Sequence, residues 1–315
     1  MNLTVHAPDG VPEVGQGDDL AALLLAVTDL RDGDVVAVTS KVVSKVEGRV
    51  VAGDRDDWVA AETARVVATR GPTRIVRNRL GLTLAAAGVD GSNVRRGSSL
   101  LLPEDPDASA RRLRKALHDR TGATVGVLVT DTAGRPWRNG QTDIAIGAAG
   151  VRVVEDFAGR HDPQGNELAV TAPAVADELA GAAELASGKL GGRPFAVLRG
   201  RPDLVLPAGE DGPGTAPLVR AVGEDLFGYG AREAVVRAVR ADAEDAAPFG
   251  HPVPAAEMAA VLRRAGLGEP TRSTDGSLEV ATTREDALAA VAFAHGWAIT
   301  GRAQGSGHRL LPRTP

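Results

Sequence analysis

Hydrophobic residues occur in two patterns along this chain. Short apolar runs bounded by polar turns predict strands at 34–40, 73–78, 98–103, 124–130 and 193–200. Longer segments with apolar residues three and four positions apart predict helices at 20–30, 58–70, 105–122, 171–189, 216–227 and 231–244. Short strands around a polar turn are expected between 151 and 171. The chain therefore combines both element types.

The pattern changes near Ala246, where the segment APFGHPVP is typical of a linker or boundary. Beyond it we expect helix, strand, helix, strand and strand at 254–266, 277–282, 284–298, 299–303 and 308–312. Roughly seventy residues can form a small packed unit, although a marginal one unless it docks on a larger body.

A dense group of polar residues lies between two apolar segments in the stretch from Thr124 to Gly150. The strand TVGVLVT stops at Asp131 and Thr132, where the backbone is expected to leave the sheet. A Gly-Arg-Pro turn follows, and then the run AIGAAG closes the stretch. Its other polar or aromatic members are Arg135, Trp137, Arg138, Asn139, Gln141 and Asp143. Polar groups held between buried segments are typical of a binding site rather than of a solvated loop.

A second candidate site follows the strand at 34–40. Ser40, Lys41 and Lys45 could hold phosphate oxygens there, together with backbone amides. The chain has only four lysines, the other two being Lys115 and Lys189, so two of them in TSKVVSK suggest a need for a compact ammonium group. An exposed basic turn, or chance, is the alternative, and the Walker motif GxxxxGK[ST] does not occur.

Two further turns carry carboxylates. Asp90, Ser92 and Asn93 form a DGSN sequence that is usually only a turn, but with Asp131 it becomes a candidate metal corner. His161 beside Asp162 allows an acid–base pair, whereas an exposed turn histidine fits the sequence better. The loop LPAGEDGPGTAP is expected to be either a disordered tip or a flap over a ligand.

Composition excludes several classes of protein. The 36 basic and 41 acidic residues give a formal charge of −5 without a basic block, so we expect no nucleic-acid partner. No apolar run is long enough to span a membrane, and the start MNLTVHAPDG lacks the pattern of a signal peptide. The absence of cysteine excludes thiolate chemistry and fits a cytoplasmic location.

The remaining chemistry favours a nucleotide-dependent enzyme. Nucleophile elbow, HExxH, dinucleotide-binding fingerprint and kinase catalytic loop are all missing from the sequence. Hard oxygen ligands suit Mg²⁺ or Mn²⁺, which complete their shells with water and substrate phosphates. Phosphoryl transfer needs metals, cations and alignment rather than covalent help from the protein.

Five segments, taken in this order, resemble the coenzyme F420-0:L-glutamate ligase (F420 γ-glutamyl ligase) family. They are PDGVPEVGQGDDL, GDVVAVTSKVVSKVEGR, NRLGLTLAAAGVDGSNV, VTDTAGRPWRNGQTDIAIGAAG and GNELAVTAPAVADELAGAAELASGK. The resemblance covers residues 1–245 and implies an α+β fold with a mixed sheet and two lobes, followed by a small α/β extension at 246–315. It also implies a homodimer.

The activity that the resemblance implies is a GTP-dependent and metal-dependent ligation. L-glutamate would be joined to coenzyme F420-0 through an amide bond, by way of an acyl phosphate, and further γ-linked glutamates could follow. Two Mg²⁺ or Mn²⁺ ions would lie near the nucleotide, with K⁺ as an optional further ion. A related amide ligase acting on another carboxylate, or a non-catalytic protein that binds nucleotide and metal, are the alternatives.

The resemblance also assigns residues, position by position. Those that would contact GTP are Val11, Pro12, Glu13, Val14, Ser40, Lys45 and Asn93. Asp90 and Asp131 would hold the first metal and Thr132 the second. Lys45 would stabilise the β and γ phosphate oxygens, and Arg135 or Arg138 would hold an anionic group of a substrate. Some relatives continue into a long flavin-binding domain, and because the tail here is much shorter we expect no FMN site.

Overall fold

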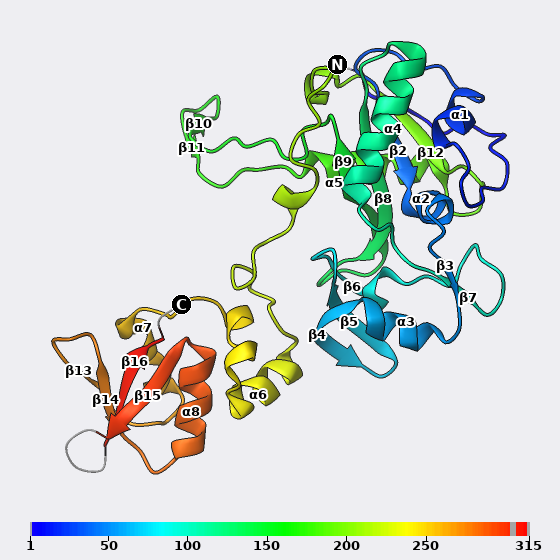
Figure 1. Cartoon of the computed structure of the whole chain (residues 1–315). Coiled ribbons are helices and arrows are strands. Elements are labelled where there is room, and N and C mark those ends of the chain that lie inside the picture. The colour runs from blue at the N-terminus through cyan, green and yellow to red at the C-terminus, as the bar shows by residue number, and fades with distance from the viewer. Residues whose placement is uncertain (1, 303–306, 314–315) are drawn as a thin grey trace. The chain divides into compact units, whose positions relative to one another are not determined.

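The computed structural model describes residues 2–302 and 307–313 of the chain. It divides into two compact units, one formed by Met1–Arg65 and Val76–Val219 and the other by Val66–Ile75 and Arg220–Pro315 (Figure 1). The expected boundary at residue 245 concerns the family domain rather than these units, and it stays a prediction.

The centre of the first unit is a five-stranded mixed sheet in the order β1-β12-β2-β8-β9. Its strands are β1 (Thr4–His6), β2 (Val35–Thr39), β8 (Gly126–Gly134), β9 (Gln141–Ala149) and β12 (Phe195–Arg199). Only the β2–β8 pair is parallel, while every other pair in this sheet is antiparallel. The carboxyl end of β2 at Thr39 therefore lies beside Thr130, and β8 continues beyond that point to Gly134.

Helices cover both faces of this sheet because successive strand residues point in opposite directions. Val36 and Val38 belong to a core that also contains residues of α1, α2 and α4, whereas Val35 and Ala37 belong to a core with α5. The helices are α1 (Leu20–Leu25), α2 (Ser40–Val46), α4 (Pro106–Thr121) and α5 (Val175–Ser187).

Smaller elements complete the first unit. They are β3 (Val50–Ala52) paired with β7 (Ser98–Leu100), the helix α3 (Arg55–Glu62), the sheet of β4 (Thr63–Arg70), β5 (Thr73–Asn78) and β6 (Thr83–Ala85), and the hairpin of β10 (Arg160–His161) and β11 (Glu167–Leu168). Short 3₁₀ turns lie at η1 (Ala86–Gly88), η2 (Pro202–Leu204) and η3 (Ala216–Leu218). The tip of the β4–β5 hairpin belongs to the second unit.

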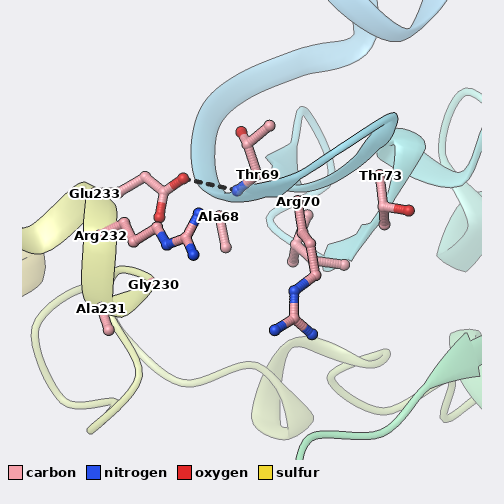
Figure 2. Close-up of a pocket in the computed structure, with 9 residues that line it drawn as sticks. Ala68, Thr69, Arg70, Thr73, Gly230, Ala231, Arg232 and Glu233 are labelled. Carbon is pink, nitrogen blue, oxygen red and sulfur yellow. Dashed lines mark hydrogen bonds between the residues drawn. The ribbon is translucent and has the colours of Figure 1, made fainter.

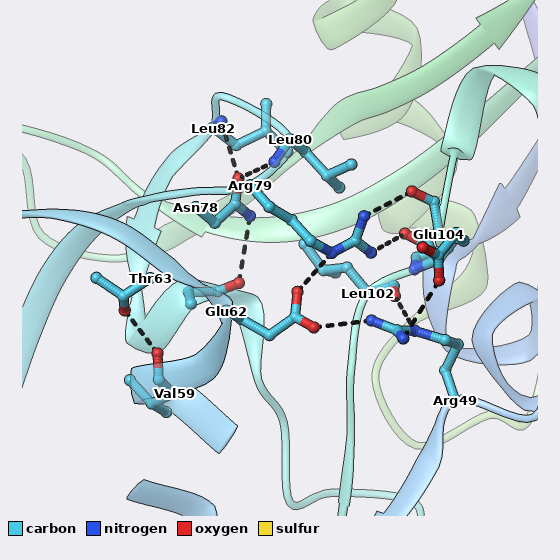
Figure 3. Close-up of polar contacts among 12 residues, drawn as sticks. Arg49, Val59, Glu62, Thr63, Asn78, Arg79, Leu80, Leu82, Leu102 and Glu104 are labelled. Carbon is cyan, nitrogen blue, oxygen red and sulfur yellow. Dashed lines mark hydrogen bonds and ion pairs between the residues drawn. The ribbon is translucent and has the colours of Figure 1, made fainter. Parts of the chain in front are cut away.

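Glu62 joins three of these pieces (Figure 3). Its carboxylate accepts hydrogen bonds from Arg49 at 2.8 Å and from Arg79 at 2.7 Å. Arg79 also donates to the carbonyls of Pro103 and Glu104. Charge-assisted bonds of this kind are about twice as strong as neutral ones. They fix the chain after β5, from which the segment leading to Asp90 begins.

The second unit has its own core around Met258, Leu262, Leu278, Leu288 and Trp297, each of them almost fully buried. An antiparallel sheet in the order β13-β14-β16-β15 packs with three helices. The elements are α6 (Ala231–Arg240), η4 (Ala243–Asp245), η5 (Ala247–Phe249), α7 (Ala255–Arg264), β13 (Thr271–Arg272), β14 (Leu278–Ala281), α8 (Glu285–Ala294), β15 (Trp297–Arg302) and β16 (Gly307–Pro312). The helix, strand, helix, strand, strand order is confirmed, while Ala303 lies outside the described residues.

Two of the expected helices were wrong in part. The segment 58–70 is helical only to Glu62 and then becomes β4, because TARVVATR is rich in β-branched residues that fit a strand. The segment 216–227 forms only the turn η3. Gly223 interrupts it with φ of +92°, where a Cβ atom would lie 2.7 Å from the carbonyl of Ala247.

Two expected boundaries also moved. The residues after β2 form α2 instead of a loop, since Ser40 begins the helix at once. The strand expected to stop at Asp131 continues to Gly134 as β8, because β9 pairs with it across a turn and extends the ladder. Asp131 and Thr132 therefore lie within a strand, beyond a register shift at Val129 and Thr130.

Candidate functional site

The parallel pairing of β2 and β8 brings the first candidate residues together. Thr39 lies opposite Thr130 in the register, so the residues that follow them meet at the same edge. Ser40 Oγ donates a hydrogen bond to Asp131 Oδ1 at 2.9 Å. Ser40 is buried and Asp131 half-buried, so this contact lies within the body of the first unit.

Asp131 has an unusual protonation equilibrium. Burial of the carboxyl group raises the pKa of Asp131 to about 6, and the negative charge of Asp143 acts in the same direction. The charge of Lys41 and the hydrogen bond from Ser40 oppose the rise without cancelling it. A carboxyl group held in this way is a candidate for a functional role.

Asp90 lies beside α2, where the ammonium group of Lys41 pairs with its carboxylate. Burial pushes the pKa of Asp90 upward, but hydrogen bonds from Lys41 and Ser92 outweigh burial and leave the pKa below its usual value. Lys41 Nζ lies 2.5 Å from Asp90 Oδ2, and the Ser92 N–H and hydroxyl donate to the same carboxylate at 2.8 and 2.7 Å. The Lys41 charge acts on Asp131 as well, where it opposes the rise of the pKa.

The backbone before Asp90 is held in an uncommon conformation. Ala86 and Ala87 have φ of +51° and +57°, a region that residues other than glycine rarely adopt. The buried Asn78 side chain donates to the Ala87 carbonyl at 3.2 Å. It also accepts hydrogen bonds from the backbone N–H groups of Leu80 and Leu82. Strain of this kind gathers at functional sites, where the surroundings enforce it.

Thr132 belongs to a neighbouring cluster. Its hydroxyl donates to Asp143 Oδ1 at 2.7 Å across the β8–β9 pair, and Thr130 donates to the other oxygen at 3.3 Å. Lys189, just beyond α5, donates to Thr132 Oγ1 at 2.7 Å and lies 3.4 Å from Asp143 Oδ1. It also pairs with Glu184 at 2.7 Å.

The other expected site residues are distributed around these two clusters. Lys45 on α2 pairs with Glu13 at 2.5 Å, which ties the turn from Val11 to Val14 to this helix. Pro12 is exposed and Val14 is buried in the core. Asn93 has φ of +57° and donates from Nδ2 to Ser92 Oγ at 3.3 Å.

Arg135 and Arg138 lie in the turn between β8 and β9, and Arg138 is exposed. Arg135 donates to the Asn139 carbonyl at 2.7 Å. His161 is exposed on its hairpin, and Asp162 caps the turn there instead of pairing with it. The fit to an exposed turn histidine is confirmed.

The loop 206–217 is neither a disordered tip nor an isolated flap in this structure. Arg114 on α4 donates to the carbonyls of Leu206, Pro207 and Glu210 at 2.9 Å each. It also pairs with the Asp211 carboxylate at 2.9 Å. The loop is therefore fixed to the body of the first unit.

Comparison with known proteins identifies the family of the chain. A sequence model described as F420-0:Gamma-glutamyl ligase matches residues 10–65 and 56–200. The chain belongs to this family. Relatives named "Coenzyme F420:L-glutamate ligase" come from Archaeoglobus fulgidus, with 39% identity over 64% of this chain and 88% of that protein, and from Methanopyrus kandleri, with 39% identity over 68% and 93%. A third, from Natronomonas pharaonis, is 42% identical over 61% and 84%.

The family match includes both clusters. It runs from the N-terminal turn through Asp90 and Asp131 to Lys189, whereas the second unit beyond Arg220 lies outside it. The resemblance noted from the sequence is thereby confirmed, and so is the α+β class with several sheets. Membership identifies the chain as an enzyme of a ligase family.

Three residues of these clusters were not assigned a place beside a metal ligand from the sequence: Lys41 and Asp143 were named only as members of the two candidate sites, and Lys189 was given no site role. Lys41, Asp143 and Lys189 each contact a residue that the family resemblance assigns to a metal. Lysine scarcity was the available signal for two of them. For Asp143 the signal was its place in a strand of otherwise apolar or small residues, where a buried carboxylate needs a partner.

The donor set of these two clusters fits a hard divalent cation. Asp90 and Asp131 offer carboxylate oxygens, and Ser40 and Thr132 offer hydroxyls. Mg²⁺ typically takes one or two carboxylates and completes its shell with phosphates and water. Among the described residues, no group of three or more His, Cys, Asp or Glu side chains is placed to hold a metal.

A pocket in the second unit is separate from these residues (Figure 2). Its volume is about 210 Å³, and its lining includes Ala68, Arg70, Ile75, Gly230 and Arg232. Glu233 accepts a hydrogen bond from the Thr69 N–H at 2.7 Å beside it. None of the expected site residues lines this pocket.

Within the described residues, no helix combines the length and apolar character needed to cross a membrane.

Proposed function

We propose that this chain is a GTP-dependent ligase that joins L-glutamate to coenzyme F420-0 through an amide bond. The observation that carries the proposal is the cluster just beyond the end of β2, where Ser40 hydrogen-bonds to Asp131 at 2.9 Å and Lys41 pairs with Asp90 at 2.5 Å. Family membership and the names of the relatives support the same reaction.

The reaction needs an electrophilic carboxyl group. A carboxylate oxygen of the acceptor attacks the γ-phosphorus of GTP, the bond to the GDP oxygen breaks, and an acyl phosphate forms. The glutamate amine then attacks the acyl carbon, loses a proton, and phosphate leaves. The products are the amide, GDP and inorganic phosphate.

Charge repulsion is the main obstacle to the first step, since both reactants are anions. Mg²⁺ or Mn²⁺ ions, when bound, neutralise phosphate charge and align the oxygens. Asp90 and Asp131 would hold the first ion and Thr132 the second. Lys45, whose ammonium lies beside the N-terminal turn, would stabilise β and γ oxygens.

Substrate carboxylates and phosphates need cations of their own. Arg135 and Arg138 lie in the turn that begins three residues after Thr132, within the same β8–β9 hairpin. Either guanidinium would bind an anionic group of the acceptor or of glutamate in a bidentate way. Ser40, Asn93 and the turn from Val11 to Val14 would contact the nucleotide. A homodimer, K⁺ as a further ion and a cytoplasmic location stay predictions.

The test is to incubate the purified chain with F420-0, L-glutamate, GTP and Mg²⁺ or Mn²⁺. We expect GDP release that depends on glutamate and acceptor together, and a product heavier by one glutamate residue. Replacing F420-0 with simple carboxylic acids distinguishes an amide ligase for another acceptor. GTP binding without turnover under all these conditions would contradict the proposal, and product masses over time count the glutamates added.

A further inference from the structure

Two lysine ammonium groups contact side-chain oxygen atoms of Asp90 and Thr132, residues that the family resemblance assigns to the two metal ions. The Lys41 ammonium contacts Asp90 at 2.5 Å, and its charge also acts on Asp131. The Lys189 ammonium contacts Thr132 at 2.7 Å and lies 3.4 Å from the buried Asp143 carboxylate. One lysine is thus present at each proposed metal position.

The two lysines come from different parts of the fold. Lys41 belongs to α2, while Lys189 follows α5. The chain's other two lysines have different partners, since Lys45 pairs with Glu13 and Lys115 pairs with Asp119. In a chain whose cations are mostly arginine, the use of two compact ammonium groups at these positions needs a reason.

We propose that Lys41 and Lys189 are exchangeable counter-cations for the two metal positions. Each neutralises its oxygen ligands in the absence of a divalent ion and must move away when that ion binds. The inference rests on the proposed function, because it takes the metal positions from there.

Electrostatics and geometry support an exchange instead of simultaneous occupation. A divalent ion on the Asp90 or Thr132 oxygen would lie within a few ångströms of the ammonium, at a distance where like charges repel strongly. Both side chains have room to rotate, with 24% of the Lys41 side chain and 58% of the Lys189 side chain exposed. A planar guanidinium held at several points would leave less easily.

The exchange predicts a coupling between metal and nucleotide. Metal alone must compete with an ammonium, whereas triphosphate oxygens offer the displaced ammonium a new partner. Each ligand should therefore favour binding of the other. Lys41 and Lys189 would regulate the order in which the site fills, and this role is distinct from that proposed for Lys45.

Mn²⁺ binding without nucleotide, measured by electron paramagnetic resonance of free Mn²⁺, tests the proposal. We expect Lys41→Met and Lys189→Met each to bind Mn²⁺ roughly 1.5-fold to fivefold more tightly than the wild type, the range for losing a partly exposed competing pair. Lys41→Arg keeps a cation and should show no such gain. Lys115→Met removes an exposed lysine paired with Asp119 and is the matched control.

The outcomes separate this inference from the proposed function. If Asp131→Asn abolishes Mn²⁺ binding but neither lysine variant tightens it, the exchange is wrong and the metal position stands. If Asp131→Asn leaves Mn²⁺ binding unchanged, the metal position itself is wrong and the inference fails with it.

A second measurement uses nuclear magnetic resonance of the lysine side chains in the wild-type protein. Protein labelled with ¹³C at lysine Cε should give four lysine signals, one for each lysine in the chain. Titration with Mg²⁺ alone should move the signals of Lys41 and Lys189 and leave that of Lys115 in place. Unmoved Lys41 and Lys189 signals at saturating Mg²⁺ would overturn the proposal.

Discussion

Asp131 shows at the level of one residue how a site can weaken the fold that holds it. Its pKa is about 6 in the folded protein, mainly because of burial, against about 3.9 in an unfolded chain. As pH rises from 4 to 6, the unfolded chain releases this proton before the folded protein does. The unfolded state therefore gains stability over that window, and above pH 6 the folded state keeps the full penalty.

Asp131→Asn should consequently raise the free energy of unfolding at pH 7.5 while abolishing ligation. A shift of about two pKa units corresponds to on the order of 2–3 kcal/mol. Urea denaturation with EDTA present, at pH 3.5 and at pH 7.5, measures the effect. At pH 3.5 variant and wild type should agree, because the aspartate is protonated in both states, and a variant less stable at pH 7.5 would contradict the sign.

The site residues that the sequence predicted are those that follow strands or occupy turns. Ser40 and Asp131 could be expected to approach each other only if their strands were parallel neighbours, which the sequence alone does not reveal. Asp143 was named as a member of the candidate site, but its pairing with Thr132 depends on the antiparallel β8–β9 ladder, and Lys189 was missed because its role depends on where α5 ends. The assignment of GTP and metal contacts came from the family resemblance and stays a prediction.

At the level of elements, Arg114 connects α4 to the loop beside β9. The Arg114 guanidinium donates to the Asp211 carboxylate and to backbone carbonyls, including that of Val125. The Arg114 side chain is only 7% exposed. Gly150 allows the approach, because a Cβ atom there would lie 1.9 Å from Arg114 Nε. One side chain thus holds Val125, just before β8, and the loop 206–211 against the helix.

Arg114→Met should destabilise the protein by about 3 kcal/mol, since it leaves the buried Val125 carbonyl, three carbonyls of the loop and the Asp211 carboxylate without their donor. Thermal unfolding measures the loss, and limited proteolysis should show new cleavage between residues 206 and 214. Arg111→Met is the control on the same helix, because Arg111 is exposed and lies 3.8 Å from Asp105. Equal effects of the two substitutions would contradict this account.

Element types were predictable where one period dominates the sequence. α4 begins after its Asp105 cap and ends before Gly122 as expected. The segment that became β4 failed because apolar residues at helical spacing were also β-branched, and pairing with β5 decided the outcome. Local sequence does not contain that partner.

At the scale of the whole molecule, the strand order was the least predictable feature. β12 lies between β1 and β2 although more than 150 residues separate it from β2 along the chain, by the positions Phe195 and Thr39. Pairing over such separations depends on the closed structure rather than on local pattern. The coarse α+β class could be predicted, because it requires only the mixture of element types.

The two units have separate cores, so we expect two unfolding transitions in calorimetry. Leu117 and Leu288 are both fully buried, the first in the core of α4 and the main sheet and the second in the core of the second unit. Leu117→Ala should lower the free energy of unfolding in one transition by about 2–5 kcal/mol, and Leu288→Ala should do the same in the other transition.

Ligand linkage identifies the transitions, because a ligand stabilises only the unit that binds it. GTP with Mg²⁺ at about one hundred times the dissociation constant should raise the free energy of unfolding by about 2.7 kcal/mol in the transition that Leu117→Ala affects. The transition that Leu288→Ala lowers should not respond. A single transition shifted alike by both variants and by the ligand would mean that the two cores unfold as one cooperative structure.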